Sequence, residues 1–141
     1  MTDALVAFLK DRLDDDERVA RAATEGPWRV DSEDFAEAIY DARNQVVVGG
    51  GRWGGEASVF DTTEDAIHIA RHDPARTLRE VEAKRGLLDL HRQVEDPQEM
   101  QDYCTECDLG RDKYPYYPCT TLRLLAAVYA DHPDYLPGWQ P

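Results

Sequence analysis

The sequence predicts an α+β fold made of an N-terminal helix, a small antiparallel sheet formed as a hairpin, and a C-terminal set of helices joined by a zinc-binding Cys3His cluster. Apolar residues recur at helical spacing at the N-terminus, and short apolar runs around a polar turn follow. Three cysteines then come after a long helical segment. The 141 residues fit a single domain, in which 1–73 would hold the first helix and the sheet and 74–141 the zinc-stabilised part.

The first predicted element is a helix over residues 2–24. Its apolar residues recur three and four positions apart while acidic residues fill the other side: Leu5, Phe8, Leu9 and Leu13. Thr2 is suited to cap the start of this helix, and Gly26-Pro27 ends it because proline disfavours helix in the preceding residue.

A hairpin is predicted next. Its strands are the apolar runs 39–40 and 46–48, separated by the polar turn 42–45, and a third short strand is expected at 56–60. The intervening stretch "GGGRWGGE" is predicted to be a connection. Arg52 and Trp53 lie at its centre, and because these residue types often anchor interfaces, they are candidate contacts for a protein partner.

Helices are predicted over 61–73, 74–96 and 120–130. Asp73-Pro74 separates the first two, since proline suits the first turn of a helix and not its interior. In the second helix, the residues expected to face inward are Leu78, Val81, Leu87, Leu88, Leu90 and Val94. The aromatic and proline-rich C-terminal tail is expected to cover the domain as irregular chain.

The cysteine spacing indicates a zinc site. Cys104 and Cys107 are separated by two residues, which lets both sulfur atoms of a tight turn reach one ion. Cys119 precedes the last helix, where the helix N-terminus favours a thiolate. His91 is the preferred fourth ligand and His132 the alternative. Four protein ligands leave no position for substrate, so the predicted zinc is structural.

A second histidine pair raises a different hypothesis. His68 and His72 share a helical face, and Asp73 could complete a metal site for a metal-dependent hydrolase. The metalloprotease motif has glutamate directly after its first histidine, and Ile69 occupies that position here. No serine or cysteine nucleophile motif is present, so a non-enzymatic role is favoured over catalysis.

The composition restricts the partners. There are 29 acidic and 16 basic residues, giving a net charge of −13, which argues against direct binding of nucleic acid. An acidic surface could instead imitate nucleic acid and inhibit or regulate a basic protein. The sequence contains no apolar run long enough to span a membrane and no secretion signal, so a cytoplasmic protein with reduced thiols is expected.

Three stretches carry a resemblance: "GPW" at 26–28, "AIYDARNQVVV" at 38–48 and "DAIHIARHDP" at 65–74. The N-terminal part resembles Ead/Ea22-like phage proteins. The whole chain, with the histidine and the cysteines of the zinc site, is similar to an uncharacterised actinobacterial family of small proteins, a domain of unknown function. These resemblances imply an accessory phage or prophage protein and name no catalytic residue. The predicted function is therefore a non-catalytic, zinc-stabilised protein that binds another protein.

Overall fold

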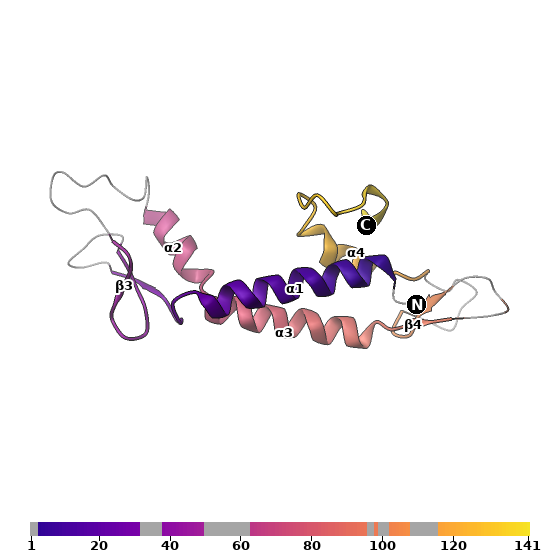
Figure 1. Cartoon of the computed structure of the whole chain (residues 1–141), viewed down its shortest axis with the longest axis horizontal. Helices are drawn as coiled ribbons and strands as arrows, with labels where there is room; N and C mark the ends of the chain where they lie inside the picture. The colour runs from indigo at the N-terminus through magenta and orange to yellow at the C-terminus, as the bar shows by residue number, and fades with distance from the viewer. Residues whose placement is uncertain (1–2, 32–37, 50–62, 96–97, 99–101, 108–115) are drawn as a thin grey trace. The chain divides into compact units, whose positions relative to one another are not determined.

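The computed structural model of the chain describes residues 3–31, 38–49, 63–95, 98, 102–107 and 116–141. Helices and two small antiparallel sheets form within these residues (Figure 1), which confirms the α+β class. The chain divides into two compact units. Unit 1 comprises Met1–Asp15 and Val81–Pro141, and unit 2 comprises Asp16–Glu80. The single-domain organisation, with its parts 1–73 and 74–141, stays a prediction.

The first helix, α1 (Ala4–Ala22), has the predicted apolar face. Leu5, Leu9 and Leu13 are each buried in unit 1, one helical turn apart. The N-terminal cap is Asp3, whose Oδ1 accepts a hydrogen bond from the Leu5 N–H at 2.8 Å. Thr2, the predicted cap, lies outside the described residues.

The long helix α3 (Pro74–Leu90) ends six residues before the predicted boundary at 96. After it the chain forms β4 (Gln93–Val94), which pairs antiparallel with β5 (Tyr103–Cys104). The pairing takes the backbone hydrogen bonds that a longer helix would have used. The prediction that Leu90 faces inward is wrong: its side chain is 54% exposed, because the helix ends at this residue.

The core of unit 1 is shared by α1, α3, β5 and the last helix, α4 (Thr120–Ala127). Its buried members are Leu5, Val6, Leu9, Leu13, Val81, Leu88, Cys104, Cys119, Leu122 and Ala126. Two of the three cysteines are therefore core residues, which places the predicted site against the main apolar cluster of this unit.

The C-terminal tail is more ordered than predicted. It contains a short 3₁₀ helix, η1 (Pro137–Trp139), and two of its aromatic rings, together with Tyr129 just before it, pack around Phe8 of α1. The ring centroids of Tyr129, Tyr135 and Trp139 lie 6.2, 6.1 and 5.1 Å from that of Phe8. Such aromatic contacts add to the burial of apolar area, so the tail is part of the unit 1 core packing.

Unit 2 contains the predicted hairpin, β2 (Ile39–Tyr40) and β3 (Val46–Val48), together with β1 (Arg29–Val30) on the other side of β2. Both pairings are antiparallel. The buried Asp41 closes the turn, because its Oδ1 accepts the N–H groups of Arg43 and Gln45 at 2.8 Å each. The strand predicted at 56–60 lies outside the described residues.

A small apolar cluster joins helix α2 (Thr63–Arg71) to this sheet. Ala66 and Ala70 of α2 are buried with Ile39 of β2. The partly buried residues packed against them are Trp28, Val30, Val47 and Val48. The small alanine side chains let the helix lie close to the short strands.

The Gly26-Pro27-Trp28 motif contacts the start of α3 through Asp73. This buried carboxylate accepts the Trp28 N–H at Oδ2 (2.8 Å) and the Arg76 N–H at Oδ1 (2.7 Å), so it also caps the helix. A Cβ atom on Gly26 would lie 2.9 Å from Asp73 Oδ2 and 3.0 Å from Ala75 Cβ. Only glycine lets the two segments approach this closely. We call this arrangement the Gly26–Asp73 contact.

Candidate metal site

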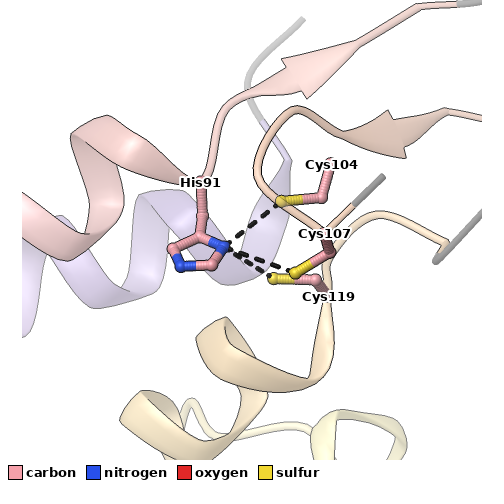
Figure 2. Close-up of side chains that lie close together, drawn as sticks. All are labelled: His91, Cys104, Cys107 and Cys119. Carbon is pink, nitrogen blue, oxygen red and sulfur yellow. Dashed lines mark hydrogen bonds between the residues drawn. The ribbon is translucent and has the colours of Figure 1, made fainter. Parts of the chain in front are cut away.

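Four side chains converge at one end of α3. The ligand atoms of His91, Cys104, Cys107 and Cys119 all lie within 4.8 Å of one another. Figure 2 shows that they come from the end of α3, from β5 and the turn after it, and from the start of α4. The structure thus brings together the four residues that the sequence singled out. We call them the His/Cys cluster.

The distances centre on one imidazole nitrogen. His91 Nδ1 lies 3.3 Å from Cys104 Sγ, 3.6 Å from Cys107 Sγ and 3.5 Å from Cys119 Sγ (Figure 2). One ring nitrogen carries at most one proton, so it can donate to only one of three sulfur atoms at a time. Hydrogen bonding alone therefore leaves the convergence of all three sulfurs on Nδ1 unexplained.

A single tetrahedral ion accounts for this spacing. Zn–S bonds of about 2.3 Å and Zn–N bonds of about 2.0–2.1 Å, at the tetrahedral angle, place the nitrogen and each sulfur about 3.6 Å apart. The three observed N···S distances, 3.3, 3.6 and 3.5 Å, match that separation. The four side chains could therefore hold one metal ion.

The β4–β5 hairpin fixes His91 opposite the first two cysteines. The His91 N–H donates to the Leu87 carbonyl at 3.0 Å and so ends the last turn of α3. Thr105 holds both flanks of His91: its Oγ1 donates to the Leu90 carbonyl at 2.8 Å and accepts the Arg92 N–H at 3.2 Å. Sequence analysis missed Thr105; its place between Cys104 and Cys107 is the only local signal for this role.

Cys119 reaches the cluster from the N-cap position of α4. Its backbone is extended, with φ −71° and ψ 166°, and its side chain makes no capping hydrogen bond. The Cys119 carbonyl accepts the Arg123 N–H at 3.1 Å, as an N-cap carbonyl does. The thiol is thus directed at the other ligands, with its Sγ 3.5 Å from His91 Nδ1.

The surroundings of the cluster disfavour negative charge on the Cys107 thiol. Burial, followed by hydrogen bonds with Cys104 and Cys119, raises the pKa of Cys107 to about 12. Burial also raises the pKa of the neighbouring Tyr117 to about 12. A bound cation reverses this preference, because a thiol that coordinates a metal ion loses its proton. The donor set is therefore suited to binding a cation.

The alternative fourth ligand makes other contacts. His132 Nε2 lies 2.6 Å from Arg12 Nη1, and His132 Nδ1 accepts the Asp134 N–H at 3.1 Å. The centroid of the His132 ring lies 5.6 Å from that of Phe8. Among the described residues, the only group of three or more converging histidine, cysteine or acidic ligands is the His/Cys cluster, and His132 is not part of it.

The remaining predicted site residues lie elsewhere. His68 and His72 belong to unit 2, where their ring centroids are 4.4 Å apart. Asp73, the suggested third ligand of that pair, is buried, and its two carboxylate oxygens accept backbone N–H groups in the Gly26–Asp73 contact. Arg52 and Trp53, the predicted partner contacts, fall outside the described residues.

The fold and the cluster define a small α+β protein with a Cys3His group that could hold a metal ion. A family of unknown function, DUF6221, matches residues 2–141, and the chain belongs to this family. No curated protein and no solved structure that was compared with the chain matches it. In the described part of the chain, no helix has both the length and the apolar composition needed to cross a membrane.

Proposed function

We propose that the protein is a non-catalytic accessory protein that binds another protein, and that one structural Zn²⁺ bound to the His/Cys cluster stabilises unit 1. The observation that carries this proposal is the convergence of three Sγ atoms on His91 Nδ1 at 3.3–3.6 Å. Thiolate and imidazole are the ligands that zinc prefers, and a set of four is the usual composition of a structural site.

The geometry favours a mononuclear zinc site over the other roles of a Cys3His set. An iron–sulfur cluster distributes its ligands over more than one iron, whereas these four ligand atoms lie within 4.8 Å of one another, around one centre. A catalytic zinc site keeps a position open for water, and four protein ligands fill that position. The zinc would therefore contribute to folding and would not activate a substrate.

Metal analysis of the tag-free chain, purified without added metal, tests the zinc assignment. We expect one zinc per chain, lost in Cys104→Ser and reduced in His91→Ala. His132→Ala is the matched control, because this histidine lies in unit 1 but outside the cluster, and it should retain the zinc. The proposal fails if the wild-type chain carries no zinc, or if Cys104→Ser retains it.

The proposed binding of another protein rests on exposed apolar side chains. Leu124 of α4 and Val128, four residues later at its C-terminal end and so on the same helical face, are 57% and 66% exposed. Exposed apolar groups that gather on one surface are typical of sites that contact other proteins. The phage or prophage setting, the actinobacterial origin and the contacts of Arg52 and Trp53 belong to this proposal and rest on the sequence alone.

The net charge of −13 supports one alternative, imitation of nucleic acid by an acidic surface that binds a basic protein. The two proposals differ in how the affinity for a bound protein partner changes with salt concentration. Affinity that depends on apolar contacts varies little with ionic strength, whereas affinity that depends on exposed charges weakens steeply as salt screens them. Binding assays over a salt series, with Leu124→Ser and Val128→Ser beside the wild type, separate them. If the affinity falls steeply with salt and neither substitution changes it, the result favours imitation of nucleic acid.

A further inference from the structure

Beyond the structural zinc, we infer that His68 of α2 and His72, the residue directly after this helix, form a second, exposed site for one divalent transition-metal cation. The cation would be of the class that prefers imidazole, namely Zn²⁺, Ni²⁺ or Cu²⁺. This site differs from the His/Cys cluster in its ligands and in its openness, and it does not depend on zinc being bound there.

The helix positions the two rings for chelation. The His72 N–H donates to the His68 carbonyl at 3.2 Å, so the helical geometry of α2 continues as far as His72. Residues four apart on a helix have their Cβ atoms about 5–6 Å apart on one face. The two ring centroids lie 4.4 Å apart, with the ring planes inclined by 41°. Small rotations about the side-chain torsions bring one nitrogen of each ring to a common ion.

The surroundings of His68 and His72 let a cation reach the two rings and attract positively charged ions. Both histidines are exposed, so a hydrated cation can reach them without any rearrangement of the core. Glu64 and Asp65 lie in the first turn of α2, and Asp65 is three residues before His68, on the same helical face. These carboxylates, within a chain of net charge −13, raise the local concentration of cations.

Two protein ligands leave the other coordination positions to water. Asp73 does not supply a third ligand, because its carboxylate is buried in the Gly26–Asp73 contact. We therefore expect weaker, reversible binding at this pair and tight binding at the closed His/Cys cluster. The expected order follows the general preference of nitrogen ligands, with Cu²⁺ bound more tightly than Ni²⁺.

Calorimetric titration of the tag-free, zinc-loaded full chain with Ni²⁺ tests this site. We use Ni²⁺ because it prefers imidazole and, unlike Cu²⁺, does not oxidise thiols. The wild type should bind one Ni²⁺ per chain with saturation. His68→Gln or His72→Gln should weaken this binding by at least about tenfold, because one imidazole alone loses the gain from intramolecular chelation.

His132→Gln is the matched control and should leave Ni²⁺ binding unchanged. Glutamine is chosen at positions 68 and 72 because its helix propensity is high. Binding that persists in both His68→Gln and His72→Gln, or the absence of saturable binding in the wild type, would overturn the inference. The same titration of Cys104→Ser distinguishes the two sites. Ni²⁺ binding that disappears in Cys104→Ser but survives in His72→Gln places the ion in the His/Cys cluster and refutes the second site.

Discussion

Unit 1 and unit 2 both hold separate chain segments together at a polar cluster, but they do so by different chemistry. In unit 1, His91 and three cysteines join α3, the β4–β5 hairpin and α4. In unit 2, the carboxylate of Asp73 joins the Gly26-Pro27-Trp28 segment to α3 by accepting two backbone N–H groups. The hydrogen bonds of the Gly26–Asp73 contact are all made within the protein, whereas the His/Cys cluster has a donor set suited to a cation. The two units should therefore respond differently to the same change.

The largest expected difference is the response to a zinc chelator. Structural zinc contributes on the order of 10 kcal/mol to the folding of small zinc domains, so its removal should open the cluster. Hydrogen exchange followed by mass spectrometry should show lost protection at 102–107 and 116–126. Protection at the unit 2 residues 38–48 should change little. Equal loss of protection in both regions would show that the two units unfold together, and added Zn²⁺ should restore protection if the effect is specific.

A smaller effect is expected from adding one methyl group to unit 2. Gly26→Ala should destabilise the protein by about 1–3 kcal/mol, because the new Cβ would lie 2.9 Å from Oδ2 of Asp73, whose carboxylate is held in place by one hydrogen bond to each oxygen. Denaturant unfolding measures this change in the free energy of unfolding. Gly86→Ala is the matched control: Gly86 lies within α3, a Cβ there meets nothing within 4 Å, and alanine should stabilise the helix by about 0.5–1 kcal/mol. Equal effects at the two sites would contradict the close approach.

An effect of comparable or smaller size is expected at the residue that supports His91. Thr105→Val keeps the shape of the side chain and removes the hydroxyl that contacts the Leu90 carbonyl and the Arg92 N–H. Loss of an outer hydrogen bond that orients a metal ligand typically lowers metal affinity by about 10–100-fold. Competition with a zinc chelator measures this affinity. Thr105→Ser retains the hydroxyl and should stay close to wild type; a valine variant with unchanged affinity would show that Thr105 does not orient His91.

The parts of the fold that follow from local pattern were predictable from the sequence. The burial of Leu5, Leu9 and Leu13 follows from helical spacing, and the β2–β3 hairpin follows from two apolar runs around a polar turn. The four members of the His/Cys cluster could be named because zinc-ligand spacing is itself local at Cys104 and Cys107.

The features that were missed depend on contacts between distant residues. The pattern of residues 87–94 fits a helix, and only the pairing of Gln93 with Cys104 and of Val94 with Tyr103 turns its end into a strand. The Gly26–Asp73 contact is similar, because nothing near either residue indicates a partner more than forty positions away. Tertiary contacts override local propensity at both places.

The order of the units along the chain has a consequence for synthesis on the ribosome. Unit 2 is one continuous stretch, Asp16–Glu80, whereas unit 1 combines the first residues of the chain with the last. Phe8 emerges early, yet the rings that pack on it belong to residues 129–139. Because nascent chains fold from their N-terminal side as segments emerge, unit 2 can fold during translation. The apolar face of the first helix then stays uncovered until the residues of unit 1 that follow position 80 have been synthesised.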